Sequence, residues 1–244
     1  MQTRHERDAL EAVCGFDTPT LFNALERFGV TRPNTGFTSP DLRCHFPELG
    51  TVAGYAVTSR WSGDQPAGLG RKPPCQGEYL RWLAGQPGPR LAVSQDMDMH
   101  PVGAGWGEWW CNVHKAMGCV GAVVQGGMRD LEGLQRLGFH CFSTHVCVGH
   151  GYDVEMDYGG PVRVAGLEVR PGDLLVGDRH GLLHIPEDIP LRELCLVATK
   201  IRELEAKVFI YCQSPQFSID GYLELASSVQ GDLPSPARCE DGAG

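Results

Sequence analysis

A short apolar run near the middle of the chain is the clearest strand signal in the sequence. Residues 120–124, VGAVV, are bounded by glycines and are typical of a buried strand. A glycine pair at 126–127 predicts a turn after it. Residues 131–138, LEGLQRLG, then place leucines at helical spacing and end in a glycine suited to a helix C-terminus. The pattern therefore predicts a strand, a turn and a helix in succession.

The same alternation of apolar and polar positions predicts the other elements. Further helices are expected at 3–14, 78–85, 107–118 and 190–210, with another that starts at 17–20 and ends at Gly29. Further strands are expected at 52–58, 91–93, 141–143, 162–164, 174–176 and 182–185. Loops are expected at 30–50, in a polar linker at 62–75 and in a glycine-rich stretch at 94–107. We predict one α/β domain, residues 1–212, and a partly flexible tail, residues 213–244.

Arg129 and Asp130 stand where the central strand passes into the helix. In open α/β sheets, ligands bind at that edge. A carboxylate beside a guanidinium, with two glycines that permit close approach, could hold a hard cation and an anionic substrate together. Two simpler interpretations remain open: Asp130 could serve only as a helix N-cap, and Arg129 only as a surface ion-pair partner.

Composition narrows the function classes. The chain has 244 residues, is 42% hydrophobic and carries a formal net charge of −9, so no nucleic-acid partner is expected. No apolar run approaches the roughly 20 residues of a membrane helix. The N-terminal stretch is charged and lacks the apolar region of a signal peptide, so a cytoplasmic location is expected. Ten cysteines without a CxxC motif predict reduced, buried thiols, with Cys119, Cys195 and Cys212 among apolar neighbours.

Other polar clusters favour structural roles. His180 and His184 are four apart, but the stretch between them is strand-like and the glutamate of an HExxH motif is absent, which disfavours zinc. The acidic run at 153–157 lacks an EF-hand glycine and is expected to be a solvated turn. Asp173 and Asp178 are expected to stabilise turns. The tryptophans at 106, 109 and 110 are expected to pack, either within the chain or at an interface.

Two long runs, GCVGAVVQGGMRDLEGLQRLGFHCFS and GGPVRVAGLEVRPGDLLVGDRHGLLHIP, are similar to the RraA-like family. That family includes 4-hydroxy-4-methyl-2-oxoglutarate/4-carboxy-4-hydroxy-2-oxoadipate aldolases and the regulator of ribonuclease E activity. The upstream runs DTPTLFNALERFGV, AGYAVTS and GWGEWW also resemble family motifs, so the likeness covers about residues 16–210. The matching positions are Gly126, Arg129, Asp130, Pro171, Gly172, Asp173, Gly177, Asp178, Gly181 and Pro186.

The resemblance implies a ββα swivelling-domain fold with a mixed sheet and flanking helices, assembled as homotrimers or homohexamers with sites near subunit interfaces. It implies a divalent cation, Mg²⁺ or Mn²⁺, held by Asp130, and contact between Arg129 and a pyruvate moiety. It also implies that backbone amides of the loop Gly107, Glu108, Trp109 and Trp110 bind the carboxylate end of the substrate. The chain departs from the family pattern at Gln125, at Asn23 and in the bulky Trp109-Trp110 pair.

The resemblance therefore predicts a metal-dependent class II aldolase that cleaves a 4-hydroxy-2-oxo acid, of the 4-hydroxy-4-methyl-2-oxoglutarate type, to pyruvate. Decarboxylation of oxaloacetate would use the same enolate stabilisation. Glu108 is a candidate to help remove the C4 hydroxyl proton, or simply a first-turn acid that complements a helix dipole. No lysine lies in these motifs, which argues against a Schiff-base aldolase. The alternative is a non-catalytic, protein-binding regulator of the ribonuclease E inhibitor type. A methyltransferase is disfavoured because no GxGxxG follows a strand.

Overall fold

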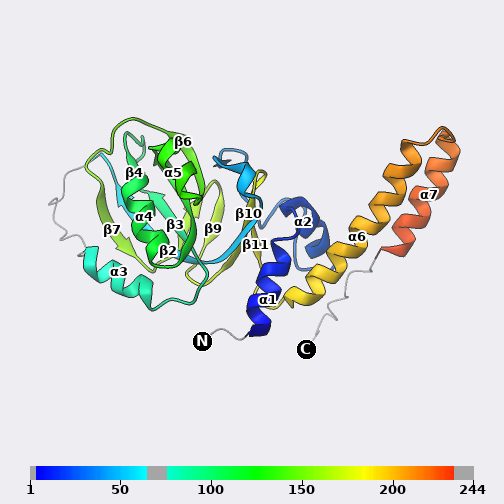
Figure 1. Ribbon diagram of the computed structural model, residues 1–244, viewed down its shortest axis with the longest axis horizontal. Helices are drawn as coiled ribbons and strands as arrows, with labels where there is room; N and C mark the ends of the chain where they lie inside the picture. Colours follow the sequence, from blue (N-terminus) through cyan, green and yellow to red (C-terminus); the bar gives the residue numbers. More distant parts are fainter. Residues whose placement is uncertain (1–3, 65–75, 234–244) are drawn as a thin grey trace, which may run out of the picture.

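The computed structural model describes residues 4–64 and 76–233, and a mixed β-sheet forms the left-hand part of the molecule in the view of Figure 1. The helices are α1 (Arg4–Val13), α2 (Thr18–Glu26), the 3₁₀ turn η1 (Pro47–Leu49), α3 (Gln76–Ala84), α4 (Glu108–Ala116), α5 (Leu131–Leu137), α6 (Leu191–Cys212) and α7 (Ile219–Asp232). The strands are β1 (Arg43–Cys44), β2 (Val52–Ser62), β3 (Arg90–Asp96), β4 (Ala104–Trp106), β5 (Cys119–Met128), β6 (His140–Val146), β7 (Val154–Tyr158), β8 (Val162–Val164), β9 (Leu167–Val169), β10 (Leu174–Asp178) and β11 (Gly181–Ile185).

The sheet order is β1-β6-β5-β3-β2-β10-β11, with β4 added beside β5 and β7 beside β2. Strands β2, β3, β5 and β6 run parallel, whereas β1, β7, β10 and β11 pair antiparallel. The predicted α/β fold with a mixed sheet and flanking helices is therefore confirmed. Because parallel strands end at the same edge, the segments that follow β3 and β5 lie close together.

The central strand β5 shows why the sheet needs cover on both sides. Successive side chains of a strand point to opposite faces. Val123 joins a buried cluster under the β8–β9 hairpin, whereas Ala122 and Val124 join a second cluster that α3, α4 and α5 cover. The continuous apolar run at 120–124 thus reflects a strand that is buried on both faces.

The predicted turn at 126–127 is wrong, because β5 continues through both glycines to Met128. A Cβ atom at Gly126 would lie 2.9 Å from Asp96 Cβ and 3.1 Å from the Trp61 ring. A Cβ at Gly127 would lie 2.5 Å from Cys147 Sγ. The glycines permit close packing on the strand, which is the other common reason for glycine in a strand interior.

Three further stretches differ from the sequence predictions. The glycine-rich loop contains the end of β3 and the short strand β4, and the acidic run expected to be a solvated turn contains β7. Helix α7 occupies part of the tail, where it lies beside α6 (Figure 1). Most of the predicted polar linker, residues 65–75, and the last residues, 234–244, lie outside the described part of the chain.

Helices α1, α2 and α6 pack against β10 and β11 around a third apolar cluster. The predicted start of α2 is confirmed, because the Asp17 side chain accepts hydrogen bonds from Thr20 N and Oγ1, both at 2.8 Å. The distal half of α6 and α7 form an arm that projects from this body (Figure 1). Within residues 4–64 and 76–233, no helix combines the length and apolar character needed to cross a membrane.

Candidate active site

Arg129 and Asp130 form the link between β5 and α5, as the sequence predicts. The Arg129 backbone N–H donates to the Trp106 carbonyl at 3.0 Å, which fixes this link beside β4. Asp130 adopts a left-handed backbone conformation, with φ of 62° and ψ of 37°. Residues other than glycine rarely adopt this conformation, and such positions cluster at functional sites.

The Asp130 carboxylate does not cap α5, so the N-cap interpretation is wrong. Its Oδ2 atom instead accepts a hydrogen bond from the Glu108 backbone N–H at 3.1 Å and lies 3.7 Å from Arg129 Nε. The Arg129 and Asp130 side chains are 37% and 42% exposed, so water and ligands can reach both. An ion pair between groups this exposed contributes little to stability, on the order of 0–1 kcal/mol. The carboxylate is therefore held in place yet remains open to a ligand.

Gly107, the residue before α4, creates the space that this arrangement needs. A Cβ atom there would lie 2.6 Å from Asp130 Oδ2 and 3.2 Å from Arg129 Cγ. Gly107 also offers no side chain to cap α4. The first N–H groups of a helix lack intrahelical partners and attract anions. The N–H groups of Trp109 and Trp110 are therefore available to a negatively charged ligand.

A cavity of about 620 Å³ lies beside these residues. Of the site residues expected from the sequence, it includes Gly107, Trp109, Trp110, Arg129 and Asp130 in its lining. The remaining described lining residues are Gln76, Tyr79, Ala104, Gly105, His150, Tyr152, Asp153, Val154 and Glu155. The structure thus brings together residues from α3, β4, α4, the β5–α5 link and β7.

Glu108 is placed differently from the other predicted site residues. Its carboxylate lies against Gly133 on α5, where a Cβ atom would overlap it. Glu108 is absent from the described lining of the cavity, although its backbone N–H holds Asp130. Its predicted catalytic role consequently receives no support from the position of the side chain.

Tyr79 and Trp110, which line the cavity, pack with His114 in one aromatic group, in which Tyr79 and His114 are buried. His114 Nδ1 lies 2.9 Å from the Trp110 carbonyl, and its Nε2 lies 2.8 Å from Tyr79 Oη. A carbonyl only accepts, so Nδ1 carries the proton and Nε2 accepts from the tyrosine hydroxyl. Burial lowers the pKa of His114 to about 4, which keeps the ring neutral. Trp110 packs as predicted, and Trp106 is buried, whereas Trp109 is 83% exposed.

Asp153 and Glu155 are lining residues that the sequence analysis did not identify. Asp153 has a positive φ of 49°, as Asp130 does, and the protein around its carboxyl group displaces water and raises its pKa. Burial and the nearby Asp153 raise the pKa of Glu155 to about 8. The glycines at 149 and 151 were the sequence signal that could have identified these two lining residues. The acidic run predicted a solvated turn instead.

The donor set suits one kind of metal ion better than others. Within the described residues, no group of three or more His, Cys, Asp or Glu side chains is arranged to hold a metal. Zinc sites normally need three or four such ligands. Mg²⁺ is commonly bound by one or two carboxylates, with water and substrate oxygens completing its shell. Asp130, with the space that Gly107 leaves beside Oδ2, fits this second type.

The cysteines in the described residues are free thiols. Cys111, Cys119 and Cys141 are buried, as expected, and burial raises the pKa of Cys119 to about 12. Cys212 is exposed, so its predicted burial is wrong. Cys75 and Cys239 lie outside the described residues.

Comparison with curated proteins finds partial matches. The protein MJ0644 of Methanocaldococcus jannaschii, which is uncharacterized, is 33% identical over 95 residues, or 38% of this chain and 45% of that protein. A protein of Halalkalibacterium halodurans, provisionally named a 4-hydroxy-4-methyl-2-oxoglutarate aldolase, is 30% identical over 82 residues, or 33% of this chain and 39% of that protein. The matched part of the chain thus spans less than half the length of either relative.

Solved structures share the fold at low identity. A crystal structure described as one of novel cellulases from gut-associated microbes has a TM-score of 0.68 at 20% identity and covers 85% of this chain and 89% of that chain. The RNase ES inhibitor family member RraAS2 of Streptomyces coelicolor has a TM-score of 0.61 at 20% identity and covers 84% of this chain and 98% of that chain. The model of the RraA-like family, described as Aldolase/RraA, matches residues 18–183, so this chain belongs to the RraA-like family.

Proposed function

We propose that this chain is a divalent-metal-dependent lyase that cleaves a 4-hydroxy-2-oxo acid and releases pyruvate. The observation that carries the proposal is the Asp130 carboxylate. It is free of helix capping, is held by the Glu108 N–H and lies beside Arg129 in a cavity of about 620 Å³. The family contains aldolases, and the provisional name of one relative is consistent with this reaction.

The reaction is a retro-aldol cleavage. The C4 hydroxyl loses its proton, the C3–C4 bond breaks, and the electron pair of that bond forms the enolate of pyruvate, which then takes a proton at C3. Asp130 is the residue that would hold Mg²⁺ or Mn²⁺. When bound, the cation supplies Lewis-acid stabilisation of the negative charge on the pyruvate fragment.

The chain supplies positive groups of its own at the same place. The Arg129 guanidinium provides a fixed charge and donors for the oxygen atoms of the 2-oxo acid. The N–H groups of Trp109 and Trp110 at the start of α4 suit the carboxylate of the same fragment. Groups fixed before the reaction need no reorganisation as charge develops, which is the main source of their catalytic effect.

The proposal is tested by pyruvate release from a panel of 4-hydroxy-2-oxo acids and oxaloacetate, with Mg²⁺, with Mn²⁺ and with EDTA. We expect turnover with at least one acid when the metal is present, and at least about a hundredfold loss in EDTA, given the several kcal/mol that a metal contributes. Coupled lactate dehydrogenase with NADH measures the product. Turnover undiminished by EDTA would refute the metal dependence, and absence of pyruvate from every acid would refute the lyase.

A second prediction concerns the space at Gly107. The backbone there is extended, with φ of −151° and ψ of −171°, and any residue can adopt this conformation. Gly107→Ala should therefore fold, but its methyl group should displace Asp130 and Arg129 and lower kcat/KM by about 10- to 100-fold. Gly149→Ala is the control, because a Cβ there meets nothing within 4 Å. Full activity in Gly107→Ala would show that the space beside Asp130 is not needed.

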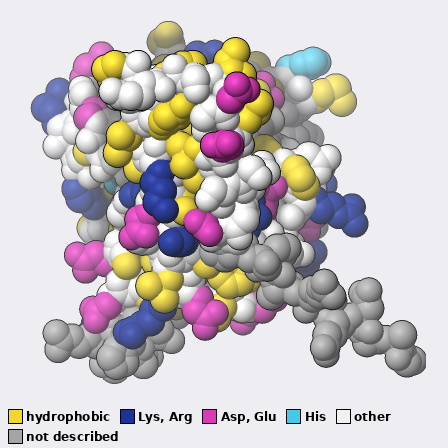
Figure 2. Space-filling view, turned by 90° about the vertical axis from the view of Figure 1, so that its right-hand side faces the viewer, with side chains coloured by type: hydrophobic (Ala, Val, Ile, Leu, Met, Phe, Trp, Pro, Cys, Tyr) yellow, Lys and Arg dark blue, Asp and Glu magenta, His cyan; other side chains and the backbone are white. Residues whose placement is uncertain are grey.

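A protein-binding regulator, of the ribonuclease E inhibitor type, is the second candidate function. Hydrophobic side chains are exposed on the arm formed by α6 and α7, including Phe209, Ile210, Ile219 and Leu223 at 58%, 70%, 72% and 58%. Figure 2 faces this arm and shows hydrophobic side chains among charged ones. Exposed apolar patches commonly mark protein-binding surfaces. Whether the chain forms the homotrimer or homohexamer that the resemblance implies remains a prediction.

A further inference from the structure

The proposed cleavage needs a base that removes the proton of the C4 hydroxyl. The Glu108 carboxylate does not meet this need, because it lies against Gly133 on α5 and outside the described cavity lining. Carboxylate and imidazole side chains are the usual general bases in enzymes. Among the described lining residues, the side chains of these two kinds are Asp130, His150, Asp153 and Glu155.

Two of these four side chains are unsuited to the task. The Asp130 carboxylate is assigned above to the cation. Burial raises the pKa of Glu155 to about 8, so its carboxyl group already carries a proton near neutral pH. The two that remain, His150 and Asp153, lie three residues apart on the segment between β6 and β7. Of the two, histidine is the type of side chain most often used as a base near neutral pH.

The hydrogen bonding of His150 presents one ring nitrogen as a proton acceptor. Its Nδ1 atom lies 2.7 Å from the Gly151 carbonyl oxygen. A carbonyl only accepts, so Nδ1 carries the proton and Nε2 of the neutral ring has the lone pair. His150 is exposed and lines the cavity, so a substrate can reach the ring.

The backbone is held in place on both sides of His150. Before it, the Gly149 carbonyl accepts a hydrogen bond from the Ala104 N–H at 2.8 Å, at the start of β4. After it, the Tyr152 N–H donates to the Gly63 carbonyl at 2.8 Å, just beyond the end of β2. A base must stay within hydrogen-bond reach of the proton that it removes, and a fixed backbone favours this.

Asp153 connects His150 electrostatically to the rest of the site. Desolvation raises the pKa of Asp153, and the positive charges of His150 and Arg129 oppose that rise. The Asp153 carboxyl group therefore lies within electrostatic range of both the imidazole and the guanidinium assigned above to the 2-oxo acid. A carboxylate beside a histidine stabilises the imidazolium that forms when the ring takes a proton.

We propose that His150 is the general base of the cleavage, a catalytic residue whose Nε2 atom takes the proton of the C4 hydroxyl. This inference rests on the proposed function and supplies the base that Glu108 does not provide. As the proton moves to Nε2, the C3–C4 bond breaks, C4 becomes the carbonyl carbon of the second product, and the electron pair forms the pyruvate enolate. The exposed imidazolium then releases its proton to water, and the enolate takes up a proton at C3.

The test compares two reactions that form the same enolate. Cleavage of a 4-hydroxy-2-oxo acid requires removal of a hydroxyl proton, whereas decarboxylation of oxaloacetate does not. With Mn²⁺, His150→Gln should lower kcat for cleavage by at least about 100-fold, the usual contribution of a general base. It should lower the ratio of cleavage to decarboxylation by at least about 30-fold. Imidazole added to His150→Ala should raise its cleavage rate at least about tenfold, because the free base can enter the vacated space.

The matched control is His100→Gln, which changes another exposed histidine outside the described cavity lining. It should keep the rate of cleavage within about twofold of the wild type. Calorimetry with Mn²⁺ should show that His150→Gln binds pyruvate with a Kd within about threefold of the wild-type value, as expected for a residue outside the pyruvate half of the site. If the wild type does not decarboxylate oxaloacetate, loss of cleavage with retained pyruvate binding and rescue by imidazole supports the same conclusion.

The outcomes separate this inference from the proposed function. Cleavage by His150→Gln within about tenfold of the wild-type rate, or equal loss of both reactions, would overturn the inference and leave the lyase standing. Loss of cleavage in Asp153→Asn without loss in His150→Gln would assign the proton to Asp153 and also overturn it. Absence of pyruvate from the wild type with every acid would refute the lyase itself, and the assignment of its base with it.

Discussion

Asp130→Asn should lower kcat/KM for pyruvate release by about a thousandfold, because it removes the charge that holds the cation and keeps the size of the side chain. Asparagine retains one carbonyl oxygen, so the hydrogen bond from the Glu108 N–H can persist. Affinity for Mn²⁺, measured without substrate by calorimetry, should fall in parallel. Loss of turnover together with loss of metal binding would identify the charge of Asp130, and not its packing, as the essential property.

The control for this variant is Glu132→Gln, which removes an acidic charge two residues away, at an exposed position in the first turn of α5. It should leave activity and Mn²⁺ affinity within about twofold of the wild type, as expected for a surface substitution. Thermal unfolding should be similar for all three proteins, because the Asp130 ion pair with Arg129 is too exposed to contribute much stability. Unchanged Mn²⁺ affinity in Asp130→Asn would contradict the assignment of the metal ligand.

The position of Arg129 and Asp130 could be predicted because it depends on local pattern. A buried strand followed by leucines at helical spacing defines a strand-to-helix link, and polar residues at that link lie at the ligand-binding edge of the sheet. What the pattern could not show is the direction of the Asp130 side chain. A residue in this position usually caps the helix. Here the backbone is left-handed and the side chain accepts from the N–H of Glu108, which lies 22 residues earlier in the chain.

The glycines at 126–127 illustrate a second limit. Glycine is used both for turns and for close approach between chains, and the sequence does not distinguish these uses. Here Asp96, Trp61 and Cys147 occupy the space that a Cβ would need. Those residues come from other parts of the chain, so only the tertiary structure shows why glycine is required and why the strand continues.

The sequence did not predict β7 or the lining residues Asp153 and Glu155, for a related reason. Strands are recognised by alternation of apolar and polar residues, and DVEMD offers acidic residues at alternate positions with little apolar content. Pairing with the outer half of β2 stabilises this strand, and that pairing is non-local. The cavity was therefore partly predictable: the Gly107–Trp110 and Arg129–Asp130 segments carry recognisable patterns, whereas the position of the lining residues Asp153 and Glu155 depends on strand pairing.

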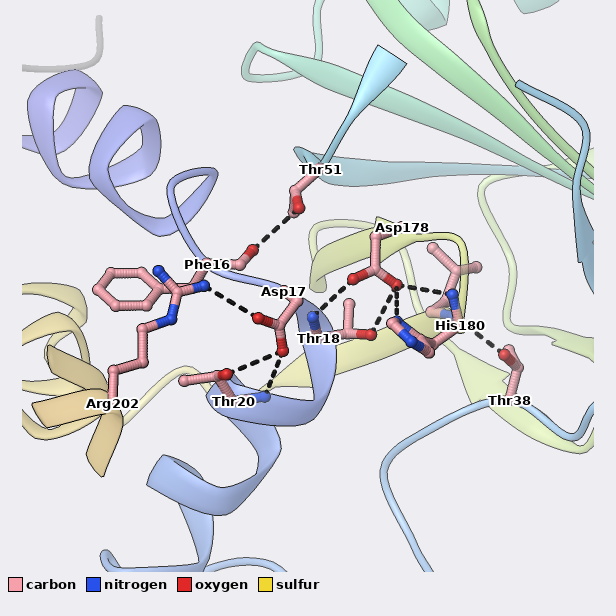
Figure 3. Close-up of polar contacts among 10 residues, drawn as sticks. Phe16, Asp17, Thr18, Thr20, Thr38, Thr51, Asp178, His180 and Arg202 are labelled. Atoms are coloured by element: carbon pink, nitrogen blue, oxygen red, sulfur yellow. Dashed lines mark hydrogen bonds and ion pairs between the residues drawn. The ribbon is translucent and has the colours of Figure 1, made fainter. Parts of the chain in front are cut away.

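Asp178→Ala should produce the largest loss of stability among these variants, about 3 to 4 kcal/mol in the free energy of unfolding. Asp178 is 5% exposed, and its carboxylate accepts hydrogen bonds from Thr18 N and Oγ1, both at 2.8 Å. It also accepts from His180 N at 2.8 Å and lies 3.1 Å from His180 Nδ1 (Figure 3). These bonds join the start of α2 to the turn between β10 and β11, so the prediction that Asp178 stabilises a turn is confirmed but incomplete.

Alanine would leave the buried N–H group of Thr18 without its acceptor, and an unsatisfied buried donor costs about 1–3 kcal/mol. The expected fall in Tm is about 10 °C for a chain of this size, measured by circular dichroism at 222 nm. Asp178→Asn should lie between the wild type and alanine, because one amide oxygen remains an acceptor while its NH₂ group faces a donor. The control, Asp188→Ala, removes an exposed carboxylate near the start of α6 and should change Tm by less than about 2 °C. Equal Tm values for the two alanine variants would show that the link between α2 and the β10–β11 turn does not stabilise the fold.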